Sequence, residues 1–233
     1  MATESIESWE NRWRRAVLEE DVEEVELCVR TILHEHPETA VAAEIRFQRG
    51  VIALEEGEGT GQDRLERARV EFGLGFASGQ AVGEAAEPWR SINRNQWALC
   101  THRLGDPQQA QDALLEVSRL RPRSLVGWEA LRLLCEISAE IATPDAEKLY
   151  KRYFSQRLSY LRALVREQSQ AETEQWNQLR FLLAMELCDR PRFVEEGVAL
   201  LETLRTEGQA KLGEELYADV VQLAAEMSSV DEV

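Results

Sequence analysis

The sequence predicts an all-α fold of stacked antiparallel helical hairpins, closed by a C-terminal capping helix. Three observations support this prediction. Apolar residues recur at three- and four-residue spacing along most of the 233-residue chain, which is the period of a helix with one buried face. Glycine, proline and aspartate cluster between these segments, where one helix ends and the next begins. Runs of alternating β-branched residues, which are typical of strands, are nearly absent.

The clearest hairpin lies at 92–124. Gly105 suits the left-handed end of a first helix, Asp106 can cap the next helix, and Pro107 suits its first turn. Pro122 then ends the second helix. The small and apolar positions on the two helices are Trp97, Ala98, Thr101 and Leu104, then Ala110, Leu114, Val117 and Leu120.

This hairpin of about thirty-four residues resembles the tetratricopeptide repeat (TPR). The resemblance is carried by the Gly-Asp turn, by a small residue followed four positions later by a large one, and by the closing proline. The segment 5–37 is similar as well, because Trp9 and Pro37 stand twenty-eight positions apart, as the tryptophan and proline of the family do. The resemblance extends over about residues 5–207.

The second helices share a register of a small residue, a large residue four later and a third residue three further on. The sets are Val25/Val29/Ile32, Ala68/Phe72/Gly75, Ala110/Leu114/Val117, Ala146/Tyr150/Tyr153 and Gly197/Leu201/Leu204. The small residue lets the partner helix approach, and the large one fills the groove beside it. The alternative is an irregular helical bundle, in which any amphipathic helix shows such spacing.

We expect one TPR-like helical repeat domain over 1–233. Its hairpins are expected at 4–37, 39–80, 88–122, 124–168 and 172–207, with the capping helix at 210–228. Thr39 is expected to cap the helix that follows it. Three glycines, Gly73, Gly75 and Gly79, are expected to weaken the end of the helix at 62–78, because glycine costs helix stability relative to alanine.

Charge and cysteine content exclude several classes of function. The net charge is −16, with 43 acidic against 27 basic residues, which argues against nucleic-acid binding and anionic lipid surfaces. No basic segment followed by an apolar stretch begins the chain, and no apolar run reaches the length of about eighteen residues that a membrane span needs. The cysteines are spread as Cys28, Cys100, Cys135 and Cys188 in apolar helix segments, which favours reduced core residues of a cytoplasmic protein.

No catalytic, metal or cofactor motif is visible. The histidines are His34, His36 and His102, and their spacing fits no known metal motif. The glycine-rich stretch 73–79 has no preceding strand, so it does not meet the context of a dinucleotide-binding loop. We therefore expect no enzyme, no metal and no cofactor.

One predicted helix, at 144–168, carries a basic stripe. At 3.6 residues per turn its cations share one face, and Ser155 and Ser159 fill the gap between them. The stripe consists of Lys148, Lys151, Arg152, Arg162 and Arg166. Such a stripe could receive an acidic peptide, a terminal carboxylate or a phosphate. The alternative is a solvated polar face that pairs with the protein's own glutamates.

The TPR resemblance implies that the first helices line a concave, ligand-binding face. The positions expected there include Arg14, Asn95, Leu99, His102, Arg103, Glu129 and Leu133. Some TPR proteins hold a peptide's terminal carboxylate with lysines and asparagines. Only Asn95 and Arg103 match that clamp in part, so this specific activity is not expected.

These observations predict a non-catalytic adaptor or scaffold that binds a partner protein or peptide through its helical surface. The candidate contact residues are the basic stripe with Arg14, Asn95, His102 and Arg103. One alternative is a structural subunit of a homo-oligomer. The other is a helical enzyme with an unrecognised site, which a pocket lined by perturbed acids would favour.

Overall fold

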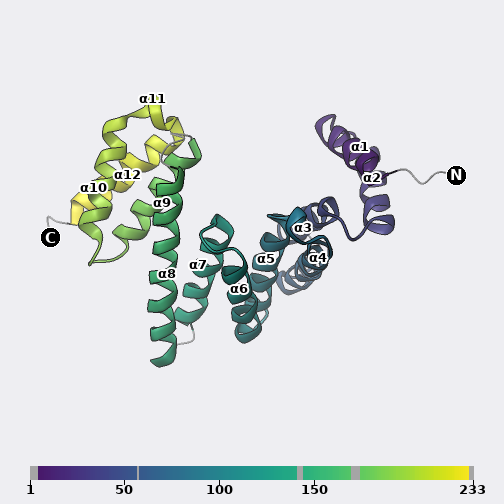
Figure 1. Cartoon of the computed structure of the whole chain (residues 1–233), viewed down its shortest axis with the longest axis horizontal. Coiled ribbons are helices and arrows are strands. Elements are labelled where there is room, and N and C mark those ends of the chain that lie inside the picture. The colour runs from purple at the N-terminus through teal and green to yellow at the C-terminus, as the bar shows by residue number, and fades with distance from the viewer. Residues whose placement is uncertain (1–4, 57, 141–143, 169–173, 231–233) are drawn as a thin grey trace. The chain divides into compact units, whose positions relative to one another are not determined.

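The computed structural model describes residues 5–56, 58–140, 144–168 and 174–230. Over these ranges the chain forms twelve α-helices and one 3-10 helix, with no strand (Figure 1), so the all-α prediction is confirmed. The helices are α1 Ile6–Leu18, α2 Val22–Glu35, α3 Ala40–Glu55, α4 Gly61–Val82, η1 Gly83–Ala86, α5 Trp89–Arg103, α6 Pro107–Leu120, α7 Leu125–Glu140, α8 Pro144–Gln168, α9 Glu174–Cys188, α10 Val194–Glu207, α11 Gln209–Leu212 and α12 Glu214–Val230.

The helices belong to two compact units. Unit 1 comprises Met1–Arg121 with Glu136–Ile141, and unit 2 comprises Pro122–Cys135 with Ala142–Val233. Consecutive helices pack in pairs, α1 with α2, α3 with α4 and α5 with α6 in unit 1, and α9 with α10 in unit 2. Helix α4 also packs along α5, and α8 along α9. Paired helices are therefore confirmed, and one continuous domain over 1–233 stays a prediction.

Local capping explains where several helices begin. The Thr39 hydroxyl accepts a hydrogen bond from the Ala42 backbone N–H at 3.2 Å, as predicted. The Asp106 carboxylate accepts one from the Gln109 N–H at 3.0 Å, after Gly105 has turned the chain with φ +95°. Both contacts satisfy N–H groups that a helix start leaves without a partner. The turn chemistry at 105–107 thus acts as the sequence predicts.

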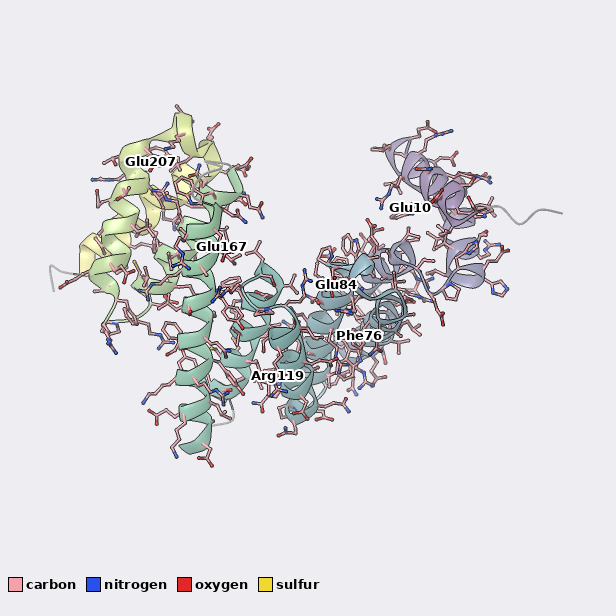
Figure 2. The ribbon with its side chains drawn as sticks, in the orientation of Figure 1. Glu10, Phe76, Glu84, Arg119, Glu167 and Glu207 are labelled. Atoms are coloured by element: carbon pink, nitrogen blue, oxygen red, sulfur yellow. The ribbon has the colours of Figure 1, made fainter. Side chains whose placement is uncertain are left out.

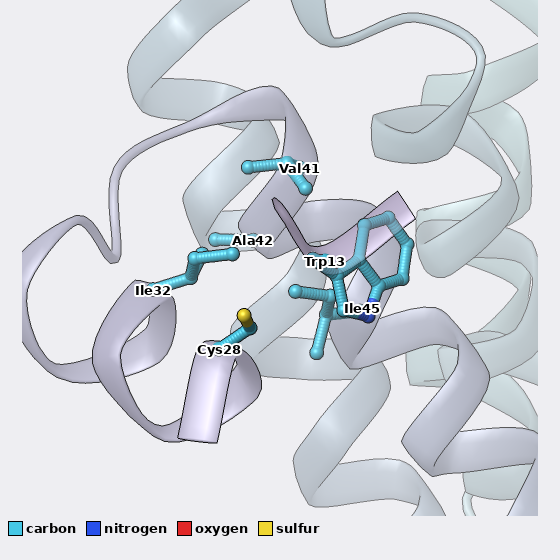
Figure 3. Packing of buried hydrophobic residues seen from close by; sticks show 6 residues of the cluster. All are labelled: Trp13, Cys28, Ile32, Val41, Ala42 and Ile45. Atoms are coloured by element: carbon cyan, nitrogen blue, oxygen red, sulfur yellow. The ribbon is translucent and has the colours of Figure 1, made fainter. Parts of the chain in front are cut away.

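The core of unit 1 begins where α1, α2 and α3 meet. Figure 3 shows six of its buried side chains, which come from all three helices. They are Trp13, Cys28, Ile32, Val41, Ala42 and Ile45. A second cluster joins α4 to α5 through Ala68, Phe72 and Cys100. Burial of such side chains is the main favourable term in holding these helices together.

The predicted register of small residues is confirmed by burial at Ala68, Ala110, Ala146 and Gly197, whereas Val25 on α2 is only half-buried. Ala68 and Ala110 are fully buried. Gly197 lies so close to α9 that a Cβ there would stand 2.6 Å from Cys188 Sγ. Close approach of paired helices therefore depends on these small side chains.

Helix α4 continues to Val82, so its expected end at 78 is wrong. A Cβ at position 75 would stand 2.4 Å from the Asn93 Oδ1 atom, and one at position 79 would stand 2.7 Å from the Arg90 Cβ atom. The glycines therefore let α5 pack directly on α4. This packing offsets the intrinsic cost of glycine in a helix.

The expected capping helix at 210–228 needs correction. Gly213 adopts φ +84°, a value that glycine tolerates and that interrupts an α-helix. The chain therefore forms the one-turn α11 and then the longer α12. Helix α12 packs against α10, where Leu204, Leu212 and Val220 form a buried cluster.

Candidate functional sites

The basic stripe lies on the exposed face of α8, in unit 2, and its five cations are all exposed. Three of them pair with carboxylates of the same chain. Lys148 Nζ lies 3.5 Å from Asp145 Oδ1, Lys151 Nζ lies 2.6 Å from Glu147 Oε1, and Arg162 Nη2 lies 2.6 Å from Glu196 Oε2. The hydrogen bond from Lys151 lowers the pKa of Glu147. For Lys148, Lys151 and Arg162, the structure therefore shows the alternative of a self-paired polar face.

The C-terminal half of the stripe differs from the rest, because it lines a hollow of about 250 Å³. Arg123, which precedes α7, joins the α8 residues there with a left-handed backbone at φ +57°. The lining residues are Arg123, Ser155, Ser159, Arg162, Ala163 and Arg166, and we call this site the anion hollow. Arg123 could not be predicted from the sequence, because only folding brings it beside α8.

Arg14, predicted on a binding face, is exposed and clamps two helices in unit 1. Its Nη2 lies 3.0 Å from Glu10 Oε1 on α1 and 3.0 Å from Glu44 Oε2 on α3. Figure 2 labels Glu10. The hydrogen bond to Glu44 raises the pKa of Arg14, and that to Glu10 adds to the rise. This pairing gives Arg14 a structural role between α1 and α3.

The predicted positions on α5 do not share one surface. Asn95 is 2% exposed, so its expected place on a binding groove is corrected to a place in the core, because α5 packs against α3, α4 and α6. His102 Nε2 lies 2.7 Å from Glu140 Oε2, within unit 1. Arg103 is exposed, and its contact with a partner stays a prediction.

Two further groove positions lie on α7 in unit 2. Leu133 is 2% exposed and belongs to the core, so its predicted place on a groove is wrong. Glu129 is half-buried, and its Oε1 lies 2.7 Å from Arg132 Nη2. Neither side chain is presented as a free binding group.

A larger open surface, absent from the sequence-based predictions, lies over α2, α3 and α4. Three adjoining hollows of about 1010, 510 and 220 Å³ occupy it. Arg49 lines the first two, and Leu33 and Arg46 line the last two. We call this continuous region the α2–α4 surface.

Aliphatic side chains are exposed within the α2–α4 surface. Ile52 on α3 is 54% exposed, and Val70 and Leu74 on α4 are 57% and 44% exposed. Val70, Leu74 and Ala77 follow helical spacing, and so they form a second apolar stripe beside the buried register of α4. That spacing is the sequence signal that could have found this surface.

The charges along the α2–α4 surface are unevenly placed. The largest hollow is edged mainly by acids, namely Glu56, Glu58, Asp63, Glu66 and Glu71, with Arg49 and Arg67 beside them. The second hollow is edged by Arg30, Arg46 and Arg49, with Glu26 and His34. Glu71 pairs with Arg46 at 2.6 Å and with Arg49 at 3.1 Å, which fixes both arginines in place.

The ionisable groups with raised pKa values lie in helix contacts and line none of these four hollows. Burial raises the pKa of the Glu186 carboxyl, although it pairs with Arg157. Burial also raises the pKa of the Cys100 thiol to about 11 and raises that of Cys188. Thiols with raised pKa values are poor nucleophiles, because the thiolate is the reactive form.

Two further observations concern the described residues. No three or more of their His, Cys, Asp and Glu side chains come together as a metal site requires. None of their helices combines the length and the apolar composition of a membrane span.

No family model matches the chain, and no curated protein matches its sequence. Among solved structures, the chain is similar to the crystal structure of PilW, a widely conserved type IV pilus biogenesis factor. The two chains are 17% identical with a TM-score of 0.44, and the match covers 91% of this chain and 81% of that chain. The function of this chain is therefore inferred from its own residues.

Proposed function

We propose that the protein is a non-catalytic interaction module of the TPR-like kind, an adaptor or scaffold that binds a segment of a partner protein on the α2–α4 surface. The observation that carries this proposal is the exposure of Ile52, Val70 and Leu74 within adjoining hollows. Exposed apolar patches rimmed by polar residues mark surfaces that bind proteins, membranes or ligands, and we propose a protein here. Burying them on binding removes apolar area from water.

The charge distribution selects the chemistry of the partner segment. An amphipathic segment would place its apolar side chains over Ile52 and Val70. Its basic residues would face the acidic edge near Glu56 and Asp63, and its acidic residues would face Arg30 at the other end. Such complementarity fixes orientation and register in protein interfaces.

The positions of the groups with raised pKa values support a non-catalytic role. An acid or thiol that acts on a substrate needs access to it and a pKa near the working pH. Glu186 is used in a buried pair with Arg157, and Cys100 is buried with a raised pKa. Both groups lie in contacts between helices rather than at an open surface.

The cysteines support a reducing compartment, and we propose that the protein is cytoplasmic. No disulfide joins Cys28, Cys100, Cys135 and Cys188, and the first three are buried while Cys188 is half-buried. Cysteines that are free and buried are usual where cellular thiols keep proteins reduced.

Affinity purification from the native host tests the function with matched surface variants. Ile52→Glu and Val70→Glu place charge in the proposed contact, and Val221→Glu, an exposed position on α12, is the control. We expect the first two to lose the partners that the wild type and the control retain. Equal capture by all four proteins would contradict the proposal.

Light scattering separates this proposal from a homo-oligomer. The purified wild type is expected to have the mass of one chain. A wild-type dimer that Val70→Glu makes monomeric would show that a second copy covers the surface, and would overturn the proposal of a separate partner.

A further inference from the structure

The anion hollow of unit 2 is a positively charged feature that lies apart from the α2–α4 surface in the sequence. Three arginines, Arg123, Arg162 and Arg166, and two serines, Ser155 and Ser159, line it. We propose that this hollow binds the phosphoryl group of a phosphorylated serine or threonine side chain. The inference deepens the proposed function and rests on it, because the phosphoryl group is taken to belong to the partner protein.

The chemistry of the lining residues suits a tetrahedral anion. Guanidinium groups stay protonated at every physiological pH and donate pairs of hydrogen bonds to phosphate oxygens. Ser155 and Ser159 are one helical turn apart, as are Arg162 and Arg166, so each pair shares a face of α8. Arg123 approaches from a different segment of the chain. Donors from two segments can therefore surround one small group.

A compact anion fits this site better than an extended one. A phosphorylated side chain concentrates a charge of roughly −1.5 to −2 in one group. A nucleic acid or an anionic membrane would extend beyond the hollow and meet a chain of net charge −16. Glu167, an exposed acid next to Arg166 in the sequence, adds repulsion toward an anion that extends past the hollow. A short anionic group can bind the arginines of the hollow without reaching the acidic residues outside it.

Glu196 on α10 shows that Arg162, one of the lining arginines, already binds a carboxylate. The Glu196 Oε2 atom lies 2.6 Å from Arg162 Nη2 on α8, and both side chains are exposed. The Arg162 guanidinium also lies 5.5 Å from the centre of the Phe193 ring, which helps to fix its position. A phosphoryl group carries more charge than a carboxylate, and so it replaces Glu196 on Arg162.

Fluorescence anisotropy tests the proposal on the full chain. The probe is a labelled alanine-glycine peptide with one central phosphothreonine, compared with the same peptides carrying threonine or glutamate. We expect the phosphopeptide to bind at least about tenfold more tightly than the threonine peptide, since charged hydrogen bonds supply that difference. Phosphopeptide and threonine peptide binding equally would overturn the proposal.

Matched variants locate the binding. Arg123→Gln removes a cation of the hollow, and Arg152→Gln removes an exposed cation of the same stripe that does not line it. We expect about tenfold weaker binding for the first and less than about twofold change for the second. Glu196→Gln is expected to tighten binding, because it frees Arg162. Equal losses for Arg123→Gln and Arg152→Gln would show general charge attraction and overturn the site.

Competing sources of phosphate are tested in parallel. Vesicles of phosphatidylcholine with phosphatidylserine and a phosphoinositide, and single-stranded DNA, are titrated against the wild type. Stronger binding of either through Arg123 than of the phosphopeptide would overturn the assignment to a protein partner. If the wild type captures a partner through Val70 but no phosphopeptide binds, the proposed function stands and this inference falls.

Discussion

Arg180 on α9 donates two hydrogen bonds to Glu207 on α10, from Nη1 to Oε2 and from Nη2 to Oε1, each at 2.8 Å. Figure 2 labels Glu207. Arg180 is buried and also lies 4.3 Å from the centre of the Trp176 ring. The paired geometry ties the two helices of a hairpin together. The hydrogen bonds from Arg180 lower the pKa of Glu207.

The first prediction concerns the pH dependence of unfolding. Because the pKa of Glu207 is lowered in the folded state, its contribution is present above the ordinary glutamate value of about 4.3 and is lost as the pH falls through the lowered pKa. Glu207→Gln should therefore cost about 1–3 kcal/mol at pH 7 and far less in acid. Urea unfolding at both pH values measures this. A cost independent of pH would contradict the role of the charged pair.

The second prediction concerns the close contact at Gly197. A Cβ there would stand 2.6 Å from Cys188 Sγ and 2.8 Å from the Cys188 backbone nitrogen. Gly197→Ala should cost about 1–3 kcal/mol by overpacking. The control, Gly61→Ala, meets no atom within 4 Å and should be neutral or gain up to about 1 kcal/mol. Thermal unfolding of both variants measures these changes. Equal unfolding midpoints for Gly197→Ala and Gly61→Ala would contradict the close contact at Gly197.

The third prediction concerns the small residue of the central hairpin. Ala110 is fully buried, so Ala110→Leu should cost about 1–3 kcal/mol. The control is a neighbouring glutamine. Gln111 is buried and therefore unsuitable, whereas Gln109 is exposed. Gln109→Leu should change stability by less than about 0.5 kcal/mol. Chemical denaturation of the two variants measures the difference in unfolding free energy. Similar losses of stability would contradict the role of Ala110 as the small residue between the two helices.

The fourth prediction concerns thiol reactivity. Cys100 is buried and its pKa is raised to about 11, so the thiolate is scarce at pH 7.5. Native protein should label with iodoacetamide slowly at Cys28, Cys100 and Cys135, and faster at the less buried Cys188. Denatured protein should label quickly at all four. Mass spectrometry at timed intervals reports each site, and fast native labelling of Cys100 would contradict its burial.

Residue spacing and the capping preferences of neighbouring residues were enough to predict the helices and many of their ends. The Gly105-Asp106-Pro107 turn and the Thr39 cap depend on neighbours in the chain, and both are confirmed. The continuation of α4 past Gly79 could not be predicted, because it depends on the approach of Arg90 from α5.

The candidate sites show the same division. The basic face of α8 follows from helical spacing alone. The anion hollow is lined by Arg162 but not by Arg152. Its third arginine is Arg123, which only the fold brings beside α8. The burial of Asn95 likewise results from three helices packing around α5. Contacts between distant segments carry no signal in a single sequence.

The central claim is that the α2–α4 surface holds a partner protein. Site-specific photo-crosslinking in the native host tests it most directly, with the photoreactive residue placed at Val70 and, as control, at Val221. We expect one dominant adduct with a different protein from position 70 and none of that mass from position 221. No adduct at position 70, or the same adduct from both positions, would contradict it.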